Sequence, residues 1–140
     1  MTTDLKIIVA LYIRGDDLDP NTVTSELNVA PSRLQRKGER KITSSNREYI
    51  VKTGMWGLIA NSDTNLLCDH IASLTSGITL DADAIFRLPG VEEAFIDVFV
   101  TAIGEEDGEG SCEFELTKDN VAALEQLRLP VRFSVSIGKD

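Results

Sequence analysis

Two stretches of this chain would carry mainly apolar side chains on both faces if they formed strands, and this feature constrains the fold more than any other. Residues 5–13 are mostly β-branched or otherwise apolar, and the run is too short for an independent helix. Residues 94–103 alternate Ala, Ile and Val with a second set of mainly apolar side chains. A strand that is apolar on both faces is typical of the interior of a sheet. We therefore expect both stretches to be central strands.

The clearest helix start lies at Asp19 and Pro20, directly after the first apolar stretch. An aspartate side chain can accept a hydrogen bond from the first helical amides, and proline fits the first helical position, which needs no donor. Leu18 and Val23 occupy the two positions of a hydrophobic staple, and Asn28 is typical of a helix end. The sequence predicts a short helix here.

Three further helices are expected along the chain. One begins at Asn61 or Ser62 and ends at Gly77, with a stripe of leucines on its apolar side. A shorter helix begins at Asp81, and Thr117 caps the last one.

Two hairpins are predicted between these helices. Residues 49–51 and 55–60 are apolar runs joined by a turn, in which Gly54 takes the left-handed conformation. The glycine-rich acidic residues 104–110 form a second turn, which leads to an alternating strand over residues 112–116.

The order of these elements predicts an α+β fold, with helices packed on a largely antiparallel sheet. The closing strand, residues 131–137, has one polar face. Both ends of the chain repeat a strand, a capped helix and an extended segment around a proline, which a duplicated ferredoxin-like arrangement would explain. No linker interrupts the sequence, so we expect a single domain over residues 1–140.

Composition and charge argue against several classes of protein. The 140 residues carry a formal net charge of -9, so binding to nucleic acid is not expected. The early apolar run is too short to span a membrane and lacks the cleavage pattern of a signal peptide. Cys68 and Cys112 have no metal-binding spacing, and we interpret them as reduced thiols of a cytoplasmic protein.

The charge is distributed unevenly. Residues 32–52 contain seven Lys or Arg and two Glu, an excess of five positive charges that leaves -14 on the rest of the chain. One interpretation is a solvated loop and hairpin whose cations neutralise an acidic body. The other is a site for a partner or for an anion, in the latter case with an aromatic ring stacked nearby. The candidate ligand-binding residues are Arg33, Arg36, Lys37, Arg40 and Trp56.

No catalytic set is recognisable in the sequence. The one histidine, His70, lies in no nucleophile motif, and with Cys68 it offers too few ligands for zinc. The acidic group of Asp16, Asp17 and Asp19 is the remaining candidate for acid and base chemistry; its alternative role is to cap a turn and a helix. We expect no metal and no cofactor.

Several short motifs occur in an order that resembles a known family. They are Gly15-Asp16-Asp17-Leu18-Asp19-Pro20, Leu27 with Pro31, Lys37-Gly38-Glu39 and Thr53-Gly54-Met55-Trp56. Over nearly its whole length the chain resembles the bacterial domain of unknown function 4279 (DUF4279). The resemblance implies a soluble bacterial protein, and it implies no activity, ligand or catalytic residue.

The leading hypothesis is a non-enzymatic binding or interaction domain in the bacterial cytoplasm, acting as a monomer or homodimer. Opposed basic and acidic segments favour a protein partner, either another protein or a second copy, because complementary charge speeds encounter and fixes orientation. An immunity-like role is one form of this hypothesis. The first alternative is a sensor for a small anion or a phosphate-bearing ligand that uses residues 33–40. The second is a carboxylate-dependent enzyme.

Overall fold

A computed structural model describes residues 4–104 and 112–139 of the chain. Strands and helices both occur, so the predicted α+β class is confirmed. In chain order the elements are β1 (Asp4–Gly15), α1 (Pro20–Leu27), β2 (Arg33–Gln35), β3 (Arg40–Ile42), β4 (Glu48–Ile50), β5 (Gly54–Ile59), α2 (Leu67–Ser76), α3 (Ala82–Phe86), β6 (Glu93–Gly104), α4 (Lys118–Leu127) and β7 (Val131–Lys139).

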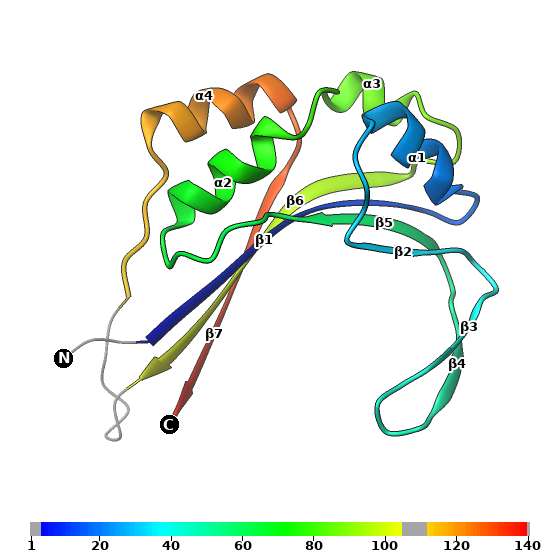
Figure 1. The fold of residues 1–140 in the computed structure, drawn as a ribbon, viewed down its shortest axis with the longest axis horizontal. Helices are drawn as coiled ribbons and strands as arrows, with labels where there is room; N and C mark the ends of the chain where they lie inside the picture. Colours follow the sequence, from blue (N-terminus) through cyan, green and yellow to red (C-terminus); the bar gives the residue numbers. More distant parts are fainter. Residues whose placement is uncertain (1–3, 105–111, 140) are drawn as a thin grey trace.

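Five strands form one curved sheet in the order β2-β5-β1-β6-β7, and β3 pairs separately with β4. Neighbouring strands are antiparallel except β6 and β7, which are parallel. The helices lie on the convex face of the sheet, and the concave face, called here the open face, carries no helix of the described chain (Figure 1). The β3 and β4 ribbon, called here the arm, extends from the sheet on the side of the open face (Figure 1).

The two ends of the chain do form similar strand, helix and strand units, β1-α1-β2 and β6-α4-β7. Their geometry differs, because β6 and β7 are neighbours whereas β5 lies between β1 and β2. The duplicated ferredoxin-like arrangement is therefore not confirmed.

The two doubly apolar stretches form the centre of the sheet, as their pattern predicted. β1 lies between β5 and β6, and β6 lies between β1 and β7. Their helix-facing side chains form the core, in which each buried Ile, Val or Leu contributes about 1.5–3 kcal/mol relative to an exposed one. These side chains are Ile7, Val9, Leu11, Ile13, Ala94, Ile96, Val98 and Val100.

Local capping residues set the starts of three helices. The Asp19 carboxylate accepts a hydrogen bond from the amide of Asn21 at 3.0 Å, and Pro20 is the first residue of α1. Asp81 and Thr117 cap α3 and α4 in the same way. All three caps agree with the sequence prediction.

The predicted start of α2 at Asn61 or Ser62 is wrong, because this helix begins at Leu67. Side chains of the helix bind the preceding segment and hold it outside the helix. His70 is buried, and its Nε2 donates to the carbonyl oxygen of Thr64 at 2.8 Å.

The predicted hairpin between residues 49–51 and 55–60 is also wrong. β4 pairs with β3, whereas β5 pairs with β1 and β2. Gly54 does not take a left-handed conformation; Gly38 and Gly90 are the described glycines that do. Gly54 instead allows a close approach of two strands, because a Cβ there would lie 2.7 Å from the carbonyl oxygen of Gly15.

The second predicted hairpin is wrong within the described residues, because residues 112–116 form no strand. The acidic turn predicted after Gly104 lies outside the described residues. β7 pairs instead with β6 in parallel, at the edge of the sheet. Its polar side chains, including Arg132 and Ser134, share the open face with Asp97 and Phe99 of β6.

Candidate functional site

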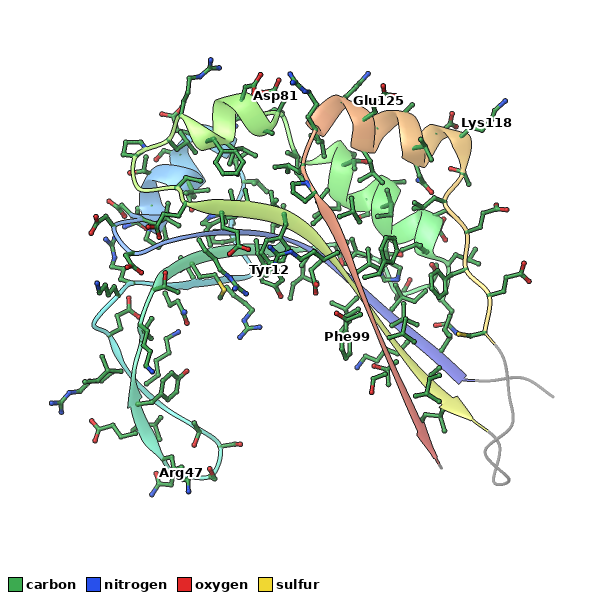
Figure 2. All side chains as sticks on the ribbon, turned by 180° about the vertical axis from the view of Figure 1, so that it is seen from behind. Tyr12, Arg47, Asp81, Phe99, Lys118 and Glu125 are labelled. Atoms are coloured by element: carbon green, nitrogen blue, oxygen red, sulfur yellow. The ribbon has the colours of Figure 1, made fainter. Side chains whose placement is uncertain are left out.

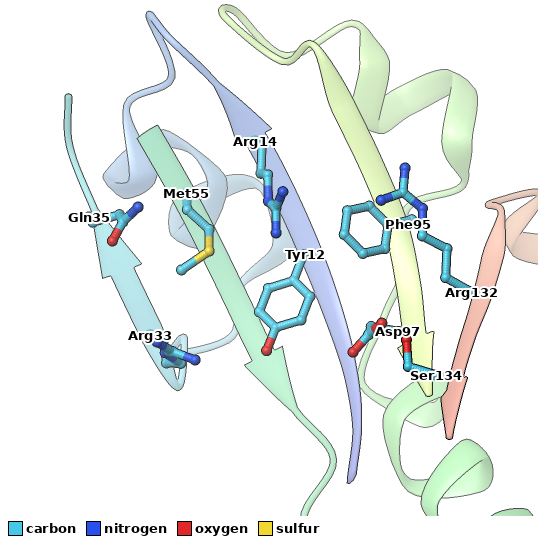
Figure 3. Close-up of a pocket in the computed structure, with 9 residues that line it drawn as sticks. All are labelled: Tyr12, Arg14, Arg33, Gln35, Met55, Phe95, Asp97, Arg132 and Ser134. Atoms are coloured by element: carbon cyan, nitrogen blue, oxygen red, sulfur yellow. The ribbon is translucent and has the colours of Figure 1, made fainter. Parts of the chain in front are cut away.

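The open face carries a pocket of about 530 Å³ (Figure 3). This volume lies within the range of small-molecule sites, roughly 300–1,000 Å³. All five strands of the large sheet contribute to the pocket. Its lining residues are Tyr12, Arg14, Arg33, Gln35, Met55, Phe95, Asp97, Arg132 and Ser134.

The floor of the pocket follows from strand register. One row across the open face consists, in order, of Arg33, Gly57, Tyr12 and Phe95. The Tyr12 ring lies against Gly57, where a Cβ would be 2.9 Å from Cε1 of the ring. The centres of the Tyr12 and Phe95 rings are 5.9 Å apart, with 46° between their planes. Glycine therefore allows Tyr12 to lie across β5 and extend the aromatic floor.

Two arginines flank this floor. The guanidinium carbon of Arg132 lies 3.8 Å from the centre of the Phe95 ring, and that of Arg14 lies 5.3 Å from it. Arg132 also forms an ion pair with Glu93, which fixes its guanidinium over the ring. A planar guanidinium stacks well on an aromatic face and keeps its N–H groups at its edge available to an anion.

The pocket is positively charged although the protein is acidic. Three arginines and Asp97 give the lining a formal charge of +2, whereas the whole chain carries -9. Within the described part of the chain, no carboxylate forms an ion pair with Arg14 or Arg33. The side chains of Arg14, Arg33 and Arg132 therefore present N–H donors to one space (Figure 3). This arrangement suits a carboxylate or phosphate group attached to a flat or apolar body.

The predicted basic site is only partly assembled. Arg33 lines the pocket, but the other basic candidates belong to ion pairs elsewhere. Arg36 lies 2.8 Å from Asp19, and Lys37 lies 3.8 Å from Asp16. Arg40 pairs with Glu48 across the arm at 3.2 Å. The structure thus brings part of the basic segment against the predicted acidic site.

Trp56 does not lie beside the basic residues. It is fully buried on the helix-facing side of β5, where its Nε1 donates to Oγ1 of Thr24 at 3.0 Å. Its neighbour Gly57 has the opposite orientation and lies in the pocket floor. The indole ring therefore forms part of the core and offers no exposed face for stacking on a ligand.

The acidic candidates lie around the start of α1. Asp19 caps this helix and pairs with Arg36, whereas Asp17 is exposed. Among residues 4–104 and 112–139, no group of three or more His, Cys, Asp or Glu side chains is placed to hold a metal ion. Cys68 and Cys112 are free thiols.

Sequence reasoning missed most of the pocket. Tyr12, Arg14, Phe95, Asp97 and Arg132 come from three strands that are distant in sequence. Alternation within each strand does indicate which side chains share a face. The missing information is the order of the strands, which places these side chains in one pocket.

The comparisons with known proteins give a family and no function. None of the described helices is long and apolar enough to cross a membrane. No curated protein and no solved structure shows a significant match. The model of one family, described as "Domain of unknown function (DUF4279)", matches residues 4–138. The chain therefore belongs to the DUF4279 family.

Proposed function

We propose that this protein is a binding domain that holds a negatively charged ligand on the open face of its sheet. The observation that carries the proposal is the placement of Arg14, Arg33 and Arg132 around the aromatic floor of Tyr12 and Phe95. Guanidinium groups form two parallel hydrogen bonds to a carboxylate or phosphate, and the half-exposed Tyr12 ring can contact an apolar part of the same ligand. Phe95 is only 3% exposed and supports Arg132 from below.

The pocket is partly organised before a ligand arrives. Arg132 is fixed between Phe95 and Glu93, so little side-chain freedom remains to be lost when it binds an anion. Asp97 lies beside Phe95 on β6, and its register partner on β7 is Arg132 (Figure 3). Its carboxylate would repel a ligand that is negative throughout and would accept a hydrogen bond from a hydroxyl or ammonium group. The preferred ligand therefore directs its negative charge to the arginines and a neutral or positive group to Asp97.

Binding is a better account of this pocket than catalysis. Its lining, as far as the chain is described, contains no histidine or cysteine, and Asp97 is its one carboxylate. General acid and base chemistry commonly requires a pair of titratable groups around the reacting atoms. The lining instead offers hydrogen-bond donors and flat apolar surface, which are the features of a recognition site.

Simple probes test the proposal directly. Benzoate combines a flat ring with a carboxylate, whereas benzylamine has the same ring with a positive charge. We expect saturable binding of benzoate by NMR titration, with shifted amides in β1 and β6, weaker binding of inorganic phosphate, and no binding of benzylamine. Equal shifts from benzoate and benzylamine, or no shifts from either, would refute the proposal.

Arginine variants locate the binding. Arg14→Gln and Arg132→Gln should each weaken benzoate binding by at least about tenfold, because a hydrogen bond to a charged group contributes about 1.5–3 kcal/mol. Arg87→Gln is the matched control, since Arg87 is an exposed arginine directly after α3. Benzoate affinity unchanged in both pocket variants would place the binding elsewhere.

We further propose that the protein acts in a bacterial cytoplasm. Its family resemblance and its two free thiols, Cys68 and Cys112, support this location. Fractionation of cells that express the full-length gene, followed by thiol labelling without prior reduction, tests it. A disulfide-linked or secreted product would contradict the proposal.

A further inference from the structure

We propose that the ligand of the open face is an acidic, partly apolar segment of another protein. This inference rests on the proposed function, because it uses the same three arginines as the anchor for negative charge. It adds the class of partner and a larger contact surface, which extends from the pocket along β6.

The open face continues beyond the pocket as an apolar strip. Phe99 and Ile103 follow Phe95 at intervals of four residues, so all three side chains lie on the same face of β6, with Asp97 and Thr101 between them. Phe99 is 38% exposed and Ile103 is 39% exposed, and Ile8 of β1 is the register partner of Phe99. Figure 2 shows Phe99 projecting from the sheet on the side away from the helices. Exposed apolar side chains of this size, with Ile8 beside Phe99 on the neighbouring strand, are typical of an interaction surface.

The length of this surface favours a polypeptide. Ile103 lies eight positions after Phe95, which corresponds to about 26 Å along a strand at about 3.3 Å per residue. A ligand confined to the arginine pocket would leave Phe99 and Ile103 exposed. An extended segment of about eight residues, or a helix of about 18 residues, spans the same distance and covers both.

Charge determines what kind of polypeptide fits. The pocket lining is +2, so carboxylates of a partner are attracted to it. Two copies of this chain placed open face to open face would bring together two sets of Arg14, Arg33 and Arg132. That like-charge contact is unfavourable, so the open face does not suit a second open face. The net charge of -9 opposes a long nucleic acid.

The arm supports the same conclusion. It extends on the side of the open face and carries three exposed or half-exposed cations, Arg40, Lys41 and Arg47, against Glu48. Ile42 and Ile50 are 69% and 58% exposed on one side of this ribbon. A two-stranded ribbon is only marginally stable without packing. An acidic partner that extends from the open face to the arm can contact these isoleucines and Arg40, which lies on the same side of the ribbon.

Photo-crosslinking in the cells that produce the protein tests the inference. A benzophenone amino acid is placed at Phe99, and the control places it at Val121, which is 52% exposed on α4 at the helix-covered side. We expect an adduct from position 99 to a large apolar residue of a protein segment whose carboxylates lie together at one end, where they reach the arginines. The adduct should disappear when Arg14→Gln and Arg132→Gln are combined with the label.

Four results would overturn the inference: no protein adduct above the Val121 control, an adduct to nucleic acid, an adduct to a second copy of this chain, or an adduct unaffected by the arginine changes. Benzoate binding separates the two proposals. If benzoate binds through the arginines but position 99 gives no acidic protein adduct, the proposed function stands and this inference fails. If neither result is obtained, both fail.

Calorimetry with a synthetic peptide of the crosslinked segment then measures the contribution of the apolar strip. Phe99→Ser and Ile103→Ser should each weaken peptide binding at least fivefold, whereas Val121→Ser should leave it unchanged. A thermal melt of each variant verifies folding, and the two strip variants guard against one that fails to fold. Equal affinity in both strip variants would remove the strip from the binding surface.

Discussion

The guanidinium carbon of Arg132, on the last strand, lies 3.8 Å from the centre of the Phe95 ring on β6. This contact joins the edge strand of the sheet to the floor of the pocket. Phe95→Leu keeps an apolar side chain but removes the aromatic face that fixes Arg132. We expect benzoate affinity to fall about two- to fivefold, since a partly exposed contact of this kind contributes about 0.5–1 kcal/mol. Isothermal titration calorimetry measures the benzoate affinity of the variant. Phe99→Leu is the control, because Phe99 lies outside the pocket, and equal losses in both variants would contradict this role of Phe95.

Gly57 provides a second test of the pocket floor. A Cβ at this position would lie 2.9 Å from Cε1 of Tyr12, so Gly57→Ala must displace the tyrosine ring. We expect a loss of about 1–3 kcal/mol in the free energy of unfolding, as in other overpacked sites, together with weaker benzoate binding. Urea denaturation measures the first effect. Gly138→Ala is the matched control on β7, where nothing lies within 4 Å of the added atom. A fully stable Gly57→Ala variant with normal benzoate affinity would show that the ring position does not matter.

The pairing of Arg36 with Asp19 separates the basic segment from the pocket. Both side chains are about half exposed, so Arg36→Gln should lower the free energy of unfolding by less than about 1 kcal/mol. It should leave benzoate affinity unchanged. Asp19→Ala also removes the cap of α1 and should therefore be more destabilising, by about 1 kcal/mol for the cap alone. Thermal and urea unfolding of the two variants show whether Asp19→Ala is more destabilising than Arg36→Gln. A large loss of benzoate affinity in Arg36→Gln would return this residue to the binding site.

The sequence predicted the elements whose information is local. The central position of β1 and β6 follows from their own apolar pattern, and the caps of α1, α3 and α4 depend on single residues such as Asp19 and Thr117. The hairpin prediction failed at Gly54 because a short turn between two apolar runs does not specify which strands pair. The close approach of Gly54 to Gly15 depends on strands that are distant in the chain.

The candidate site was predictable only in part for the same reason. Arg33 was identified because it lies in a basic segment, but Arg14 and Arg132 are single arginines of two strands that carry no basic cluster. Their proximity requires the order of five strands. Trp56 shows that a prediction of this kind depends on the exact position in a strand, because successive residues point to opposite faces of the sheet. Gly57 lies in the pocket floor, and Trp56 lies in the core.

The junction between α2 and α4 gives a prediction about stability. Asn120 is buried, and its side chain accepts a hydrogen bond from the Thr117 amide at 3.0 Å and donates one to the carbonyl oxygen of Cys68 at 3.2 Å. Asn120→Ala leaves both partners without this contact and should lower the free energy of unfolding by about 1–3 kcal/mol. Glu125→Ala, at an exposed position of the same helix, is the control and should change it by less than about 0.5 kcal/mol. Urea unfolding compares the stability of the two variants. Equal losses would mean that the buried amide of Asn120 does not hold the two helices together.

Trp56 can report which face of the sheet binds the ligand. Its ring is fully buried among the core residues of the helix-covered face, so acrylamide should quench its fluorescence weakly in the folded protein and strongly after unfolding. A ligand in the arginine pocket lies on the opposite face of the sheet and does not contact the indole. Saturating benzoate should therefore shift the amides of β1 and β6 without changing the emission of Trp56 or its quenching. Thr24→Val, which removes the acceptor of the indole N–H, is the positive control and should alter the emission by itself. A benzoate-dependent change in Trp56 emission, abolished by Thr24→Val, would place the ligand on the helix side and contradict binding at the open face.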